Sequence, residues 1–163
     1  MKLYIKQKVF SWKDRFTVKD ETGADRYTVE GKVFSIGKKL FVYNAAGDEV
    51  AYIREKVPSL LPKFIVEIGG QEVAEIVKKI SFLKQKYEVH GPDWTVQGNF
   101  TAHDYTIMQG EFPVVTIHKQ WMSWGDTYEI NSADPSKALL ALAVVLAIDA
   151  VLAAQTAAAA AST

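Results

Sequence analysis

The stretch that decides the fold of this chain is Asp134-Pro135-Ser136-Lys137-Ala138-Leu139-Leu140-Ala141-Leu142-Ala143-Val144-Val145-Leu146-Ala147-Ile148-Asp149-Ala150-Val151-Leu152-Ala153-Ala154. Asp134 is a favoured helix cap, and Pro135 suits the first helical position, where its missing N–H is not needed. No residue from Ala138 to Ile148 is polar. A helix that is apolar on every side is either wrapped by protein or placed in a lipid bilayer.

The length of this helix makes a membrane anchor the alternative to a core helix. At about 1.5 Å per residue, residues 135–155 form a rod of about 31 Å, which is enough to cross a bilayer. However, alanine is only weakly apolar, and Asp149 at bilayer depth would cost a few kcal/mol. The flank from Gln155 onward also has no Lys or Arg. We therefore expect the helix to be wrapped by the protein itself.

The rest of the chain has the pattern of short antiparallel strands. About a dozen segments are rich in β-branched and aromatic residues and are bounded by Gly, Asp or Pro, which is typical of strands and turns. The run Val57-Pro58-Ser59-Leu60-Leu61-Pro62 is the exception, and we expect it to be an apolar connection because its prolines exclude a central strand. A closed sheet leaves no exposed edges. The sequence therefore predicts an α+β, mainly β fold: an antiparallel barrel enclosing the C-terminal helix.

Composition restricts the possible functions. The chain has 163 residues, with 19 basic and 19 acidic side chains and no cysteine. Zero net charge provides no general attraction for nucleic acid. The absence of cysteine excludes disulfides, iron–sulfur clusters, thiolate zinc sites and cysteine nucleophiles. The N-terminus shows no signal peptide, so we expect a cytoplasmic protein, with a peripheral position at the membrane as an option.

Several motifs resemble the LURP-one-related family, and most closely its bacterial YxjI-type members. They are residues 8–23 (KVFSWKDRFTVKDETG), 27–37 (YTVEGKVFSIG), 121–130 (WMSWGDTYEI) and 147–149 (AID). The resemblance covers residues 1 to about 152 and implies a fold similar to tubby C-terminal domains and phospholipid scramblases, with twelve strands around a hydrophobic helix. We expect one domain, 1–155, and a frayed alanine-rich tail, 156–163.

The resemblance implies little about activity. Plant relatives are associated with defence, tubby domains bind phosphoinositides, and scramblases act on bilayers. The family carries no catalytic motif, so no catalytic residue and no cofactor are assigned.

Asp149 is the most informative polar residue because it lies within the apolar run. A buried carboxylate needs hydrogen-bond donors or a cation. We predict a structural acid that is hydrogen-bonded near the barrel mouth, for instance to a Trp indole N–H or to backbone amides. The alternative is a catalytic or ligand-sensing acid at an open barrel end.

Basic residues concentrate in two places. Lys78, Lys79, Lys84 and Lys86 flank Phe82-Leu83, and a second group consists of Lys6, Lys8, Lys13 and Arg15. Such a patch is suited to bind anionic lipid headgroups, with Phe82 inserted into the membrane interface. The alternative is an ordinary solvated hairpin, which has the same composition. Trp121 and Trp124 bracket a short loop and suit either an interfacial anchor or the cover of a barrel mouth.

The remaining candidate chemistry is weak. His90, His103 and His118 have no metal-binding spacing, and His103-Asp104 lacks a nucleophile elbow. We therefore expect a non-enzymatic binding module that recognises anionic phospholipid or a protein partner through its surface. A hydrolase-like enzyme near Asp149 and a purely structural or interaction protein are the alternatives. The sequence does not indicate an oligomeric state.

Overall fold

The structure is a computed structural model that describes residues 1–6, 15–33, 36–80, 84–123 and 125–162. Within these residues it has twelve strands, one 3-10 turn and one long helix. The strands are β1 (Lys2–Lys6), β2 (Arg15–Asp20), β3 (Asp25–Val33), β4 (Lys38–Asn44), β5 (Glu49–Glu55), β6 (Lys63–Ile68), β7 (Gln71–Ile80), β8 (Gln85–His90), β9 (Trp94–Asn99), β10 (Asp104–Gln109), β11 (Phe112–Met122) and β12 (Gly125–Ser132). The turn η2 (Pro135–Lys137) leads directly into α1 (Ala138–Ala161).

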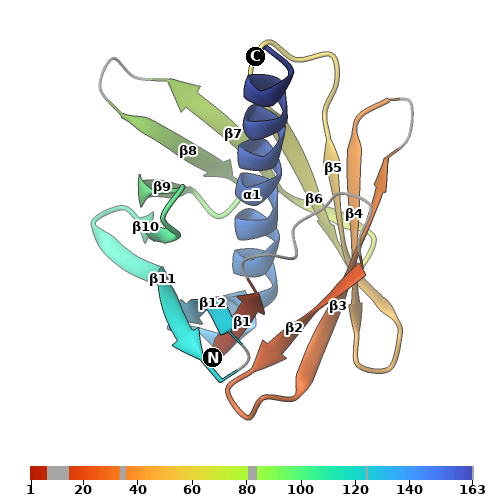
Figure 1. Ribbon diagram of the computed structural model, residues 1–163, viewed down its shortest axis with the longest axis vertical. Helices are drawn as coiled ribbons and strands as arrows, with labels where there is room; N and C mark the ends of the chain where they lie inside the picture. Colours follow the sequence, from red (N-terminus) through yellow and green to blue (C-terminus); the bar gives the residue numbers. More distant parts are fainter. Residues whose placement is uncertain (7–14, 34–35, 81–83, 124, 163) are drawn as a thin grey trace.

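The twelve strands form a closed barrel in the simplest order, with each strand antiparallel to the next along the chain. The barrel closes where β1 pairs with β12, with Lys2 opposite Asn131 and Lys6 opposite Thr127. Figure 1 shows the strands arranged around α1. The predicted antiparallel barrel around a C-terminal helix is therefore confirmed, and closure removes the unpaired edges that an open sheet would expose.

The helix fills the lumen. Every side chain from Ala141 to Val151 is buried, so all faces of this part of α1 contact protein. Leu142 and Leu146 are completely covered, and they belong to one core cluster with inward-facing strand residues such as Val29 and Ile53. Burial of each Leu stabilises the fold by about 1.5–3 kcal/mol. The frequent alanines let the helix fit between strands that approach it from all sides.

The predicted start of the helical segment is confirmed. The Asp134 side chain accepts a hydrogen bond from the backbone N–H of Ser136 at 2.9 Å, and Pro135 is the first residue of η2. This cap compensates for backbone donors that have no partner in the first turn.

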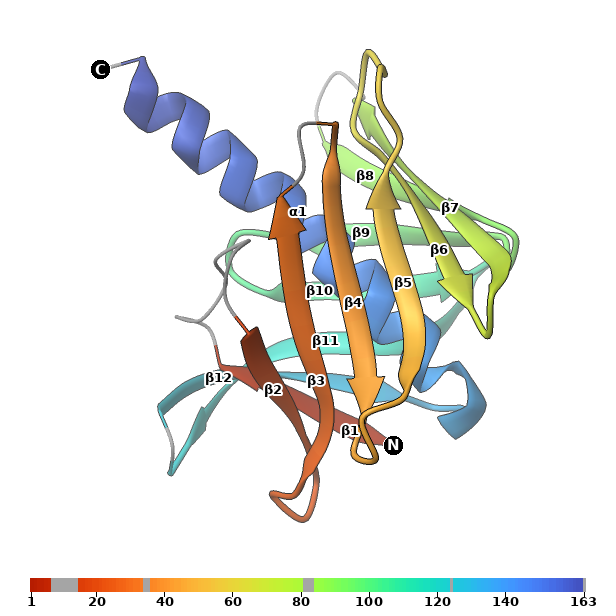
Figure 2. The same cartoon turned by 90° about the vertical axis from the view of Figure 1, so that its right-hand side faces the viewer.

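The far end of α1 leaves the barrel, as Figure 2 shows. Residues from Gln155 to Ser162 are exposed. By length and composition α1 could cross a membrane, but 67% of its most apolar window is buried inside the barrel, which makes it mainly a core helix. The segment from residue 156, which we expected to be a frayed alanine-rich tail, is the last part of α1, which continues to Ala161. Alanine has the highest helix propensity.

The two ends of the barrel are defined by the course of α1. The helix begins just after β12 ends at Ser132, and we call this end the base. We call the opposite end, where α1 leaves the lumen, the rim. Because the strands are antiparallel and in chain order, odd-numbered strands end at the rim and even-numbered strands begin there.

We expect Leu146→Ala to lower the free energy of unfolding by about 2–5 kcal/mol, because the lumen cannot close over the lost volume. Denaturant unfolding measures this change. Ala158→Ser, beyond the barrel on the same helix, is the control and should shift stability by no more than about 0.5 kcal/mol. Equal effects of the two substitutions would mean that α1 does not pack in the lumen.

Candidate functional site

A group of three side chains closes the core where α1 reaches the rim. Asp149 on α1 is only 6% exposed. Its carboxylate accepts a hydrogen bond from the hydroxyl of Tyr128 on β12, and its other oxygen lies 3.0 Å from Nε2 of His103. The rings of His103 and Tyr128 stack with their centroids 4.1 Å apart. We call these three residues the acid cluster; its donors are a tyrosine and a histidine, not the Trp indole or backbone amides that we expected.

The position of His103 depends on the turn between β9 and β10. The Asn99 side chain accepts a hydrogen bond from the N–H of Ala102 at 3.1 Å, and the N–H of His103 donates to the carbonyl of Phe100 at 3.2 Å. His103 itself has a left-handed backbone with φ of 50°, which few residues other than glycine adopt. The turn is thus held in a conformation that brings the imidazole to α1.

Two further tyrosines lie close to the acid cluster. Tyr87 and Tyr105 are buried, and their hydroxyls have no hydrogen-bond partner among the described residues. Burial raises the pKa of each phenol well above its ordinary value, and the negative charge of Asp149 raises it further. Gly98 allows β9 to approach this region closely, since a Cβ there would lie 2.7 Å from the Cα of Tyr105.

A pocket of about 290 Å³ opens beside the acid cluster, and we call it the acid pocket. Among the described residues that line it, none is a lysine or arginine. The lining residues are Thr101, His103, Tyr128, Asp149, Leu152, Ala153, Gln155 and Thr156. Asp149 is thus one of the residues that line the acid pocket, with 6% of the residue exposed.

A larger hollow of about 1170 Å³ adjoins the acid pocket and runs from the rim at β8 along β9 and β10 to Met108 and Pro113, near the base. We call it the rim groove. Its lining contains Lys84 and Lys86 and, among the described residues, no carboxylate. The remaining lining residues are Gln85, Gln97, Gly98, Asn99, Phe100, Thr101, Thr106, Met108, Pro113, Leu152 and Gln155. Thr101, Leu152 and Gln155 line both hollows, so the two are neighbours.

The structure divides the lysines that the sequence grouped together. Lys84 and Lys86 lie in the rim groove, and Lys79 and Lys86 share Glu88 at 3.7 Å each. Lys78 instead belongs to the inward-facing side of β7 and is 4% exposed, and this burial lowers its pKa. Its placement in a surface patch is therefore corrected.

Phe82 and Leu83, which the predicted lysine patch flanks, lie outside the described residues. The same is true of Lys8 and Lys13 from the second basic group and of Trp124. From the second basic group, Lys6 and Arg15 are described; they are exposed and lie at the rim.

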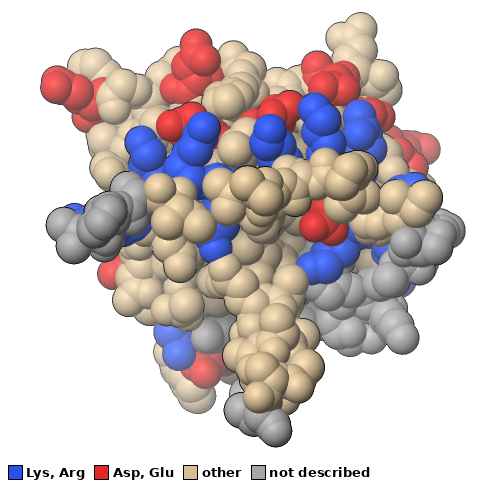
Figure 3. All heavy atoms as spheres, turned by 90° about the horizontal axis from the view of Figure 1, so that it is seen from above, with Lys and Arg blue, Asp and Glu red and all other residues tan. Residues whose placement is uncertain are grey.

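Charge is distributed unevenly between the two ends of the barrel. Basic residues gather at the rim, and Figure 3 shows them as a band beside the projecting end of α1. The described strand ends and loops at the rim carry Lys6, Arg15, Lys32, Lys38, Lys39, Lys56, Lys63, Lys79, Lys84 and Lys86. Acidic residues predominate at the base, which carries Asp20, Glu21, Asp25, Asp48, Glu49, Glu72, Asp93, Glu111 and Asp134. Each end also carries the opposite charge, with Glu30, Glu55, Asp104 and Asp126 at the rim and Lys2, Lys19, Arg26 and Lys137 at the base. The zero net charge of the chain thus conceals an excess of basic residues at the rim and of acidic residues at the base.

Exposed apolar side chains follow the same division. Leu60 is fully exposed and Trp121 is 81% exposed, and both lie at the rim. Ile36, Val57 and Ile80 are also exposed there. Among the large apolar residues exposed in the described part of the chain, Phe112 lies at the base. Apolar side chains that gather on one face are a sign of an interaction surface.

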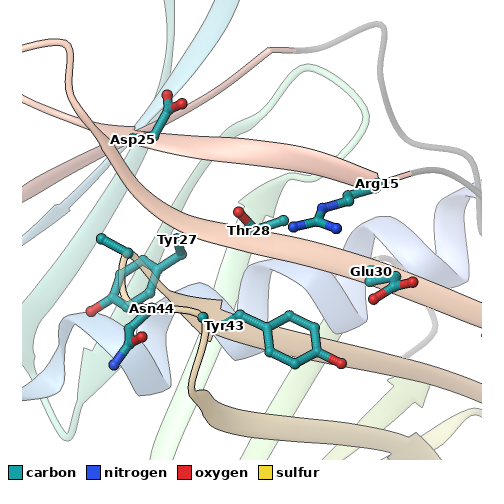
Figure 4. Close-up of a pocket in the computed structure, with 9 residues that line it drawn as sticks. Arg15, Asp25, Tyr27, Thr28, Glu30, Tyr43 and Asn44 are labelled. Carbon is teal, nitrogen blue, oxygen red and sulfur yellow. The ribbon is translucent and has the colours of Figure 1, made fainter.

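A further hollow of about 480 Å³ lies over β2, β3 and β4. Figure 4 shows its polar side chains spread along these strands without converging on one point. Arg15 and Glu30 lie towards one end, and Asp25 lies at the other. This hollow therefore lacks the arrangement of a binding site.

The histidines do not converge. His90 contacts Glu88, His118 contacts Asp104, and His103 contacts Asp149, each in a separate place. Among the residues that the structure describes, no group of His, Asp and Glu is arranged to hold a metal ion.

We expect Asp149→Ala to lower the free energy of unfolding by about 1–3 kcal/mol, since the buried donors of Tyr128 and His103 lose their acceptor. Thermal or denaturant unfolding checks this value. Asp104→Ala removes a carboxylate that is 67% exposed, and as the control it should change stability by no more than about 0.5 kcal/mol. Unchanged unfolding of Asp149→Ala would show that the acid cluster does not hold the helix.

The buried phenols predict a loss of stability in alkali. Because the pKa of Tyr105 is raised on folding, the folded protein binds more protons than the unfolded chain above the ordinary tyrosine pKa of 10.0. Stability is therefore complete below about pH 10 and falls as the pH rises further. Tyr105→Phe should make this fall shallower, as measured by denaturant unfolding at several alkaline pH values. If the free energy of unfolding fell equally steeply with pH in the variant and the wild type, the raised pKa of Tyr105 would not be the cause of the loss of stability.

Comparison with known proteins agrees with this architecture. The family model described as LURP-one-related matches residues 1–149. The chain is 34% identical over 152 residues to the uncharacterised protein YxjI of Bacillus subtilis (strain 168), which covers 93% of this chain and 94% of that protein. The fold of the present chain is similar to the X-ray structure of a protein from Arabidopsis thaliana, with a TM-score of 0.62 and 19% sequence identity. The match covers 91% of this chain and 90% of that chain. This chain belongs to the LURP-one-related family.

Proposed function

We propose that the protein is a non-enzymatic, peripheral membrane-binding module that docks its rim on an anionic phospholipid surface. The observation that carries the proposal is the coincidence of two features at one end of the barrel. Basic side chains and exposed apolar side chains both gather at the rim, where the apolar end of α1 leaves the lumen.

The basic side chains match the anionic headgroup layer of a lipid surface, and the exposed apolar side chains match the apolar region beneath it. Each cation near an anionic membrane contributes about 1 kcal/mol. Apolar side chains that leave water contribute about 25 cal/mol for each Å² buried. Leu60, Trp121 and the exposed end of α1 can enter the interface while the lysines around them remain at the headgroups.

The charge distribution also gives the docking a direction. The acidic base is repelled by the surface that attracts the basic rim. Zero net charge is therefore compatible with binding to an anionic surface.

The filled lumen and the arrangement of Asp149 favour a function that depends on the surface of the protein, not on an internal site. The helix α1 occupies the lumen, which is the space in which a barrel-shaped carrier holds its ligand. The pair of Asp149 and His103 does not favour a hydrolase either. In a catalytic triad the second imidazole nitrogen faces a nucleophile, whereas Nδ1 of His103 has no hydrogen-bond partner among the described residues.

Vesicle flotation with charge variants tests the proposal. The rim variant carries Lys6→Gln, Lys32→Gln and Lys56→Gln, and the base variant carries Lys2→Gln, Lys19→Gln and Arg26→Gln. We expect wild-type protein to float with vesicles that contain anionic phospholipid and to dissociate as salt is raised. At about 1 kcal/mol per cation, the rim variant should bind about 100-fold more weakly, and the base variant should bind like the wild type.

A second pair of variants tests the apolar contribution. Trp121→Ser at the rim should weaken flotation, and Phe112→Ser at the base should leave it unchanged. Equal effects of rim and base substitutions would contradict docking through the rim. A wild-type protein that binds no anionic vesicle, but instead forms a complex with another protein through the rim, would replace the lipid proposal with a protein partner.

A further inference from the structure

The acid pocket and the rim groove have opposite charges and adjoin each other. The acid pocket contains the carboxylate of Asp149 and no lysine or arginine among its described lining residues. The rim groove contains Lys84 and Lys86 and no carboxylate among its described lining residues. Thr101 and Gln155 line both, so the two hollows are direct neighbours.

The acid pocket has the chemistry of an ammonium site. A carboxylate with low exposure attracts a cation more strongly than one in water, because the charge is less screened. The stacked rings of His103 and Tyr128 line the same pocket. Oxygen acceptors of Thr101 and Gln155 at its border suit a cation that carries N–H donors.

The rim groove has the chemistry of a phosphate site. Lys84 and Lys86 supply positive charge, although Lys86 also lies 3.7 Å from Glu88. The amide and hydroxyl side chains of Gln97, Asn99 and Thr106 supply hydrogen-bond donors. Phe100 and Leu152 add apolar surface beside them. This combination of cationic, hydrogen-bonding and apolar side chains suits a phospholipid headgroup together with the first carbons of its acyl chains.

We propose that the two hollows form a single site for a phospholipid headgroup that combines a phosphodiester with a primary ammonium, as in phosphoethanolamine lipids. The phosphate lies at Lys84 and Lys86, and the ammonium lies at Asp149. This inference rests on the proposed docking of the rim to a membrane, because docking presents headgroups to this site. A quaternary ammonium has no N–H to donate to Asp149, so the site discriminates against phosphocholine.

The experiment compares vesicles that have the same anionic content but carry either phosphatidylethanolamine or phosphatidylcholine as the neutral lipid. We expect the wild type to bind the phosphatidylethanolamine vesicles about fivefold more tightly. Lys84→Gln with Lys86→Gln should remove this preference.

A lysine introduced into the acid pocket tests the ammonium position without disturbing the acid cluster. Thr156 is exposed and lines the pocket, so Thr156→Lys supplies an ammonium from the chain itself and should remove the preference for phosphatidylethanolamine. Ala159→Lys adds the same charge to the exposed end of α1 outside the pocket and should retain the preference. Asp149→Asn keeps an oxygen acceptor at this position but loses the charge, and should behave like Thr156→Lys.

The outcomes separate this inference from the proposed function. Binding to all anionic vesicles without a preference for phosphatidylethanolamine would overturn the headgroup site and leave membrane docking intact. Equal behaviour of Thr156→Lys and Ala159→Lys would overturn the position of the ammonium. Soluble sn-glycero-3-phosphoethanolamine is the second arm, and calorimetric binding of this compound together with the vesicle preference supports the site. Its binding in the absence of any vesicle binding would assign the site to a free phosphoethanolamine compound and overturn the lipid source.

Discussion

The burial of an apolar helix inside a closed sheet is the constraint on which the rest of the structure depends. No face of α1 between Ala141 and Val151 is suited to water, and the twelve strands cover all of it. Each strand contributes its inward-facing residues to the same core, so the barrel and the helix stabilise each other. With the lumen filled, the chemistry available to partners lies on the outside and at the two ends.

The second constraint is that α1 is longer than the lumen. The helix reaches the rim near Asp149 and continues in solvent to Ala161. At this boundary the packing changes from apolar to polar, and His103 and Tyr128 supply the contacts that a carboxylate requires there. The rim therefore combines an apolar projection, a buried acid and a surrounding set of cations, whereas the base has mainly acidic turns.

Much of the fold could be predicted from the sequence because the signals are local. The apolar run from Ala138 to Ile148 indicated a wrapped helix, and Asp134 with Pro135 marked its start. The candidate site was less accessible to such reasoning. Asp149 contacts His103 and Tyr128, which lie 46 and 21 residues away in the chain, and only the closure of the barrel brings them together.

The basic patch shows a different limit. Lys78 and Lys79 are adjacent in sequence, but successive residues of a strand face opposite sides of the sheet, so one is buried and the other is not. The buried positions Ala74 and Ile76 provide the signal that places Lys78 on the inner side. The division of charge between rim and base could not be recognised before the register of all strands was known, because each end draws its residues from the whole length of the chain.

The central claim, that the rim faces a membrane, is tested most directly by amide hydrogen exchange with and without anionic vesicles. The account predicts that vesicles slow exchange in the described rim segments, such as residues 56–62, and in the projecting part of α1 from Gln155 to Ala161. The turns at the base, such as residues 21–24 and 45–48, should exchange at unchanged rates. Protection confined to the base, or no protection anywhere under conditions in which the protein is vesicle-bound, would contradict it.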